Sequence, residues 1–200
     1  VVPPQWSVTY RFIIAAVAMA LLAMLKGESL RLGRKALVPA AFLGLTQFCI
    51  NFNAVYLAER HITSGVVATV FALLLIPSSL LAWAFLGQRP TRRFVLSSLV
   101  AVAGIVLLFV HELREHGASA NQIAAGIALT LFGMTGASTA NVVQARPEIR
   151  RFPLLSLIAW SMAAGAIIDG IFALAMTGLP VFDSRPSYWA GLVYLAIPAS

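Results

Sequence analysis

The stretch that decides the fold is residues 62–86, ITSGVVATVFALLLIPSSLLAWAFL, which contains no charged side chain. A helix needs about 20 predominantly apolar residues to cross the hydrocarbon core of a bilayer. A transmembrane β-strand would instead alternate polar and apolar residues over about 10 positions, and this stretch does not alternate. The segment is therefore predicted to be a transmembrane helix.

Similar apolar segments follow one another along the whole chain. The other complete ones are residues 7–25, 36–58, 94–110, 122–145 and 153–177, and a seventh begins near Ser187 and is cut at Ser200. No connection between them is long enough to hold a soluble domain. We therefore predict an all-α, polytopic helix bundle with six complete and one partial transmembrane helix, and we expect the chain to be a fragment of a longer protein.

The composition agrees with a lipid environment. Hydrophobic residues make up 60% of the chain, charged residues 10%, and the mean hydropathy is +0.89, whereas about 25% of residues are charged in an ordinary soluble domain. The net charge of +7 would suggest nucleic acid in a soluble protein. Here the bases lie between apolar segments, so membrane lipid is the expected partner and nucleic acid is not.

The basic residues are distributed unevenly among the connections. Ten of them lie in residues 26–35, 87–93 and 146–152, whereas the alternate connections carry only Arg60, Arg114 and Arg185. Connections rich in Lys and Arg remain on the cytosolic side of a membrane. We therefore predict that the three basic connections face the cytosol.

Motifs of soluble catalysis are absent from the sequence. It contains no Gly-x-x-x-x-Gly-Lys loop and no His-Glu-x-x-His pair, and no Gly-x-Ser-x-Gly elbow. The histidines His61, His111 and His116 are predicted to lie in outer loops without metal-ligand spacing, and the one cysteine, Cys49, is interpreted as a small buried hydrophobe. We expect no catalytic residue, no metal and no cofactor, and hence no enzyme.

A set of short motifs occurs in a definite order. They are Pro3-Pro4 before Tyr10-Arg11-Phe12, NAVYLA at 53–58 followed by TSG at 63–65, LIP at 75–77, LGQRP at 86–90, AGIVL at 103–107, Asn141 with Gln144, Trp160, and Tyr194-Leu195. Together they resemble the drug/metabolite transporter superfamily, in particular its EamA-type branch. Gln88 stands where that family has a glutamate, so no role that needs a carboxylate there is carried over.

The resemblance implies a ten-helix inverted-repeat transporter whose first helix and C-terminal helices are missing from this chain. Residues 1–111 would form the first repeat and residues 122–200 the truncated second one. Such a protein would be a secondary transporter of the bacterial inner membrane that exports a small metabolite, such as an amino acid or a derivative, by alternating access between the repeats. The alternatives are a multidrug or toxic-compound exporter of the same fold, an intramembrane enzyme, and a non-transporting scaffold.

Polar side chains within the predicted helices are the candidates for a substrate pathway, because each is costly to bury in lipid. Gln47 and Asn51 lie four residues apart and share one helix face. The other candidates are Tyr56, Pro77, Asn141, Gln144 and Trp160. Tyr56 and Trp160 are interpreted as cavity aromatics. For the other five candidates the alternative is a structural role, such as helix–helix hydrogen bonding, capping or a static kink. Asn53 points away from Asn51 and is interpreted as structural.

Asp169 is the one acidic residue well inside a predicted span. An intramembrane carboxylate carries protons or binds cations in many transporters. The alternative is a structural ion pair, for which Arg11 is the candidate partner because both residues lie in the outer half of their helices. The resemblance implies that these two helices lie at the periphery of the cavity, which favours the structural role.

Overall fold

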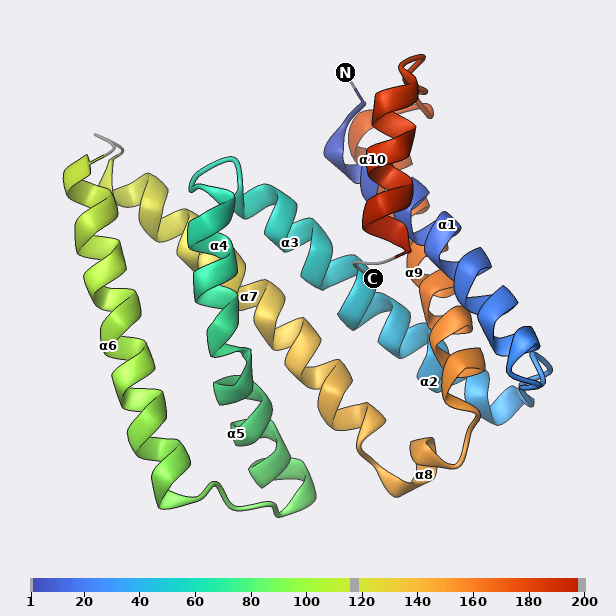
Figure 1. Ribbon diagram of the computed structural model, residues 1–200, viewed down its shortest axis with the longest axis horizontal. Coiled ribbons are helices and arrows are strands. Elements are labelled where there is room, and N and C mark those ends of the chain that lie inside the picture. The colour runs from blue at the N-terminus through green and yellow to red at the C-terminus, as the bar shows by residue number, and fades with distance from the viewer. Residues whose placement is uncertain (1, 116–118, 198–200) are drawn as a thin grey trace. The chain divides into compact units, whose positions relative to one another are not determined.

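The computed structural model describes residues 2–115 and 119–197 (Figure 1). His116 and Ser200 lie outside this part of the chain. The described residues form helices and no strands, so the predicted all-α fold is confirmed.

The predicted spans correspond closely to the helices of the structure. These are α1 (Pro4–Leu25), α2 (Arg34–Leu43), the π-helix η1 (Gly44–Ile50), α3 (Asn51–Ala58), α4 (Ser64–Phe71), the 3₁₀ turn η2 (Ala72–Leu74), α5 (Leu75–Leu86), α6 (Arg92–Glu115), α7 (Ala120–Gln144), α8 (Pro147–Arg150), α9 (Leu154–Thr177) and α10 (Pro186–Ala196). In the described residues, six helical stretches are long and apolar enough to cross a membrane. The chain is therefore an integral, multi-pass membrane protein.

The helix end that differs most from the prediction is that of α6. The apolar span ends at Val110, yet α6 continues through His111 to Glu115. Residues 111–115 are HELRE, and Glu, Leu and Arg are strong helix formers even outside an apolar span. The prediction that His111 lies in a loop was therefore wrong.

The helices belong to two compact units. The first comprises residues 1–53 and 143–200, and the second comprises residues 54–142. In the first unit α1 and α9 lie side by side as an antiparallel pair (Figure 1). The α2–η1 segment packs on α9, and α10 packs on α1.

One end of the α1–α9 pair is held by hydrogen bonds to the connection that follows α1. Glu28 Oε2 accepts hydrogen bonds from the Ser156 backbone N–H and hydroxyl at 3.0 and 3.2 Å. Pro153, the N-cap residue of α9, makes no side-chain cap of its own. A carboxylate at this position satisfies an otherwise free N–H and interacts favourably with the helix dipole. The Trp160 indole N–H also donates to the Leu30 carbonyl at 2.9 Å.

The other end of the pair is held by hydrogen bonds to the connection that follows α9. The Trp6 indole N–H donates to the Gly178 carbonyl, and the Tyr10 hydroxyl donates to the Val181 carbonyl, both at 3.2 Å. Trp6, Tyr10, Ala173 and Leu192 belong to one buried cluster. Side chains of each helix thus bind the connection that leaves its partner.

The helix pair formed by η1 and α9 approaches closely at two glycines. A Cβ on Gly44 would lie 2.7 Å from the Gly165 backbone nitrogen and 2.7 Å from the Ser161 carbonyl oxygen. A Cβ on Gly165 would lie 2.7 Å from the Phe48 Cβ. Small residues allow helix backbones to pack directly against each other in membranes, so these glycines set the distance between η1 and α9.

The second unit is built around a bent helix. Pro77 has no N–H and its ring crowds the carbonyl four residues earlier, and the 3₁₀ turn Ala72–Leu74 lies at that point between α4 and α5. A buried apolar cluster, which includes Ile62, Val70 and Met134, packs this unit. The Ser78 hydroxyl donates to the Ser138 hydroxyl at 3.1 Å.

The connection before α10 carries a tight ion pair. Arg185 donates its backbone N–H and its guanidinium to the Asp183 carboxylate, with the shortest contact at 2.7 Å. These hydrogen bonds lower the pKa of Asp183 from its ordinary 3.8 to about 2. The pair therefore stabilises the folded connection above about pH 4, and its contribution is lost as the pH falls toward 2.

We expect Arg185→Gln to raise the Asp183 pKa back toward its ordinary value. The guanidinium hydrogen bonds, which are the largest cause of the shift, are absent in that variant. The measurement is an NMR titration of ¹³C-labelled aspartate carboxyl groups in micelles, with Asp183→Asn identifying the resonance. An unchanged titration midpoint in Arg185→Gln would contradict the assigned cause.

Candidate functional site

Two predicted site residues lie together on the η1–α3 segment. Gln47 is in the π-helix, and Asn51 is the first residue of α3. π-Helical turns are rare and are frequently found at functional sites. Asn51 is 5% exposed. The Gln47 Oε1 and Asn51 Oδ1 atoms are buried and have no hydrogen-bond partner in the described part of the chain.

Buried oxygens without a hydrogen-bond partner are unfavourable in a packed helix interface. Leaving a buried acceptor unpaired costs roughly 1–3 kcal/mol, and most buried polar atoms in proteins have a partner. Two such atoms on one helix face therefore indicate a place where water or a bound molecule supplies the donors. This arrangement is the candidate functional site.

The other polar face of the same segment is directed at α9. Asp169 is 1% exposed, and its Oδ1 accepts a hydrogen bond from the Asn53 side-chain amide at 2.6 Å. The same amide nitrogen donates to the Cys49 carbonyl at 3.0 Å and lies 3.8 Å from the Cys49 sulfur. Asn53, Cys49 and Asp169 thus form a polar cluster between the two helices.

Arg11 lies on the neighbouring helix α1. Its guanidinium sits over the Phe52 ring, 4.7 Å from the ring centroid, and 5.6 Å from the centroid of Phe12. Such cation–π contacts stabilise a desolvated arginine. The ion pair between Asp169 and Arg11, and a coupling role for Asp169, stay predictions.

The remaining candidates are spread over several elements. Tyr56 is half-buried on α3, and Pro77 lies in the first turn of α5. Asn141 is exposed, and Gln144 is half-buried at the last residue of α7. Trp160 binds the Leu30 carbonyl through its indole N–H. The structure brings Gln47 and Asn51 together on one segment, and the roles of the other candidates stay predictions.

Two members of the polar cluster are not recognisable as interacting groups from the sequence. Residue type alone indicates a small hydrophobe at Cys49, and Asn53 is set apart because it points away from Asn51. The available signal is their spacing, since residues 49 and 53 share a helix face. Their partner, Asp169, lies 116 positions from Asn53, and nothing local to the sequence connects them.

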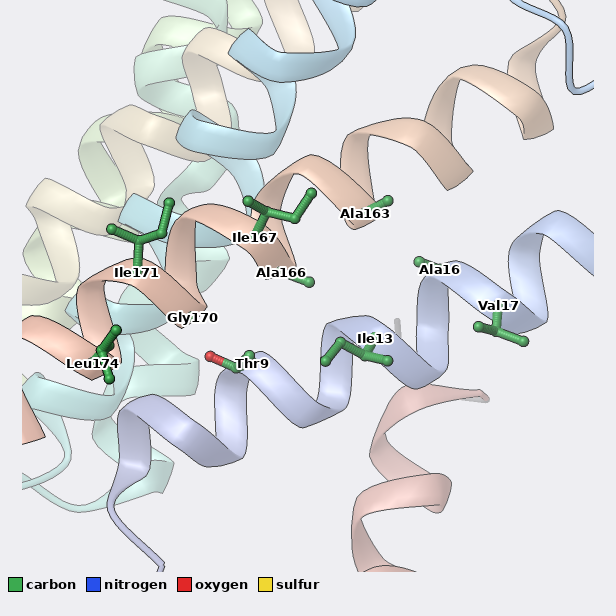
Figure 2. A pocket seen from close by; sticks show the side chains of 10 residues that line it. All are labelled: Thr9, Ile13, Ala16, Val17, Ala163, Ala166, Ile167, Gly170, Ile171 and Leu174. Atoms are coloured by element: carbon green, nitrogen blue, oxygen red, sulfur yellow. The ribbon is translucent and has the colours of Figure 1, made fainter. Parts of the chain in front are cut away.

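An apolar groove runs along the α1–α9 pair (Figure 2). It has a volume of about 520 Å³ and is lined by Thr9, Ile13, Ala16, Val17, Ala163, Ala166, Ile167, Gly170, Ile171 and Leu174. The hydroxyl of Thr9 already donates to the Gln5 carbonyl at 3.0 Å. The groove therefore offers apolar contact and little hydrogen bonding.

The sequence model of the EamA-like transporter family matches residues 1–110. The chain belongs to the EamA-like transporter family. The match contains all of η1 and α3, and hence the candidate site. No curated protein and no solved structure matches the chain.

Membership of the EamA-like family confirms the resemblance read from the short motifs. This EamA-like protein is a membrane transporter of the drug/metabolite type, with a helical multi-pass architecture. The family is one of transporters, so the polar groups in its spans are interpreted as parts of a transport pathway or of the helix packing around it.

Proposed function

We propose that this EamA-like protein is a secondary transporter of the bacterial inner membrane that exports a small metabolite, such as an amino acid or a derivative. The observation that carries the proposal is the pair of buried, unpartnered oxygens of Gln47 and Asn51. A transporter needs polar groups within the membrane that are satisfied only when its substrate is bound.

The hydrogen bonds at the ends of the α1–α9 pair support alternating access by an inverted repeat. The donors Tyr10 and Trp160 are 150 positions apart, and their acceptors Leu30 and Val181 are 151 apart. Because the two helices are antiparallel, the corresponding bonds lie at opposite ends of the pair. Inverted repeats give a transporter two related conformations that open to opposite sides of the membrane.

We expect the double variant Gln47→Leu/Asn51→Leu of the full-length protein to lose transport while it remains folded. Removing two unpartnered oxygens also removes their desolvation cost, so the thermal stability should stay level or rise. Transport is measured as accumulation of labelled amino acids in proteoliposomes, across a panel. Asn121→Leu, which removes an exposed amide at the start of α7, is the matched control.

Two outcomes would contradict the proposal. Full transport by the folded double variant would remove Gln47 and Asn51 from the pathway. Failure of the full-length protein to move any member of the panel would remove amino acids as its substrate class.

The apolar groove favours a second candidate, a multidrug exporter. Its lining of Ile, Leu, Val and Ala side chains fits hydrophobic compounds of varied shape. A promiscuous exporter would show many weak hydrophobic competitors. Such compounds should compete for transport in the same proteoliposomes. The variant Ala166→Leu, within the groove, should weaken this competition. Both results together would support this candidate over the first.

A further inference from the structure

The two unpartnered amides of the candidate site share a chemical feature. In both Gln47 and Asn51 the buried, unsatisfied atom is the carbonyl oxygen, Oε1 in one and Oδ1 in the other. A carbonyl oxygen accepts hydrogen bonds and donates none. The group that completes this site must therefore bring N–H or O–H donors.

Two side-chain donors on the same helical segment are already engaged. The Thr46 hydroxyl donates to the Phe42 carbonyl at 2.9 Å. The Asn53 amide nitrogen has two hydrogens, and it donates to Cys49 and to Asp169. The Asn53 amide thus binds Asp169 Oδ1 on the face directed at α9, whereas the oxygens of Gln47 and Asn51 remain available.

The charge of the segment disfavours one common type of ligand group. Residues 36–58 contain no Lys, Arg or His, and the Arg11 guanidinium of the neighbouring α1 is engaged over the Phe52 ring. A substrate carboxylate in a low-dielectric site needs a cationic partner or several N–H donors. An amine has the opposite requirement, because its N–H groups need acceptors. Gln47 and Asn51 are four residues apart and share one helix face, and a primary ammonium group has three N–H donors, enough for both oxygens. A hydroxyl group has only one.

We propose that Gln47 Oε1 and Asn51 Oδ1 bind the primary amine of the substrate. This inference rests on the proposed transport function and names the part of the substrate that the site recognises. The rest of the substrate is held elsewhere in the pathway, and hydrogen bonding to nitrogen gives the selectivity.

A series of probes that share the phenethyl group tests the proposal without any variant. Full-length protein in detergent is titrated with phenethylamine, with its N,N,N-trimethyl derivative and with 3-phenylpropionate, and the melting temperature is recorded. The trimethyl compound keeps the positive charge but has no N–H, and the propionate has acceptors only. We expect phenethylamine to bind at least about tenfold more tightly than either, because each loses the hydrogen bonds to both oxygens.

Variants then locate the binding. Asn51→Leu and Gln47→Leu should each weaken phenethylamine binding several-fold, whereas Asn121→Leu should leave it unchanged. Asn51→Asp retains an acceptor oxygen and adds negative charge, so it should bind phenethylamine at least as well as the parent protein.

Several results would overturn the inference. Equal binding of the trimethyl compound would show that charge or apolar contact, and not hydrogen bonding, selects the ligand. Preference for 3-phenylpropionate, or no binding of phenethylamine at millimolar concentration, would also overturn it. Because binding in detergent does not require transport, amine binding without accumulation in liposomes would reject only the proposed transport. If the trimethyl compound inhibits amino-acid transport as well as phenethylamine does, only the amine site would be rejected.

Discussion

Gly44→Ala is expected to destabilise the folded protein by about 1–3 kcal/mol, although alanine is ordinarily the better helix former. The new Cβ would lie 2.7 Å from two backbone atoms of α9, the Gly165 nitrogen and the Ser161 oxygen. Backbone atoms in a packed helix cannot rotate aside as a side chain can. The variant must therefore push η1 away from α9 and disturb the segment that carries Gln47 and Asn51.

Two other glycines provide graded controls for this prediction. A Cβ on Gly126 would meet the Ile62 side chain at 2.8 Å, which can adjust, and a Cβ on Gly104 would meet nothing within 4 Å. Thermal unfolding in detergent should therefore rank Gly44→Ala as the least stable and Gly104→Ala as equal to the parent or about 0.5–1 kcal/mol more stable. Equal stabilities of Gly44→Ala and Gly104→Ala would show that the close approach is not present in solution.

Asn53→Leu is expected to destabilise the protein by about 2–3 kcal/mol, because it removes the amide that donates to the buried Asp169 carboxyl. Leucine has a similar branched shape, so the lost hydrogen bond and not a cavity causes the effect. Asp169→Leu alone leaves the Asn53 amide without this acceptor. The double variant removes both groups and should be more stable than the sum of the single changes predicts.

The double-mutant cycle separates the pair from its surroundings, and we expect a coupling of about 1–2 kcal/mol in chemical denaturation. Additive effects would show that Asn53 and Asp169 do not interact.

Asp169→Asn retains an oxygen for the Asn53 hydrogen bond and removes the titratable carboxyl. Because the family resemblance implies a peripheral position for these helices and hence a structural role for Asp169, we expect the pH dependence of transport to be unchanged in that variant. A lost or shifted pH dependence would instead assign Asp169 to ion coupling.

The helices are predictable from the sequence because their signal is strong and local. Residues 62–86 contain no charge, and the structure places α4, η2 and α5 within two residues of that stretch. The bend in this helix is also readable, since Pro77 removes an N–H wherever it lies in a helix. The uneven distribution of bases independently supports the number of helices, because one missed helix would mix the basic connections with the others.

The packing is not predictable in the same way. Nothing in residues 44–50 distinguishes a π-helix from an α-helix, although this segment forms a π-helix that packs on α9. The close approach of Gly44 to Gly165 and the bond from Asn53 to Asp169 join positions more than a hundred residues apart. Polarity alone is enough to identify Gln47 and Asn51, but the absence of partners for their oxygens is visible only in the folded chain.

The pairing of α1 with α9 has a consequence for biosynthesis. Helix α1 and Glu28, which caps α9, leave the ribosome early, yet residues 29–153 must be translated before α9 appears. At 5–20 residues per second, that interval is on the order of ten seconds. During this time the nascent α1 must wait in the insertion machinery or in lipid with its α9-facing side uncovered. Co-translational degradation should therefore act most strongly on chains that stall before Leu154.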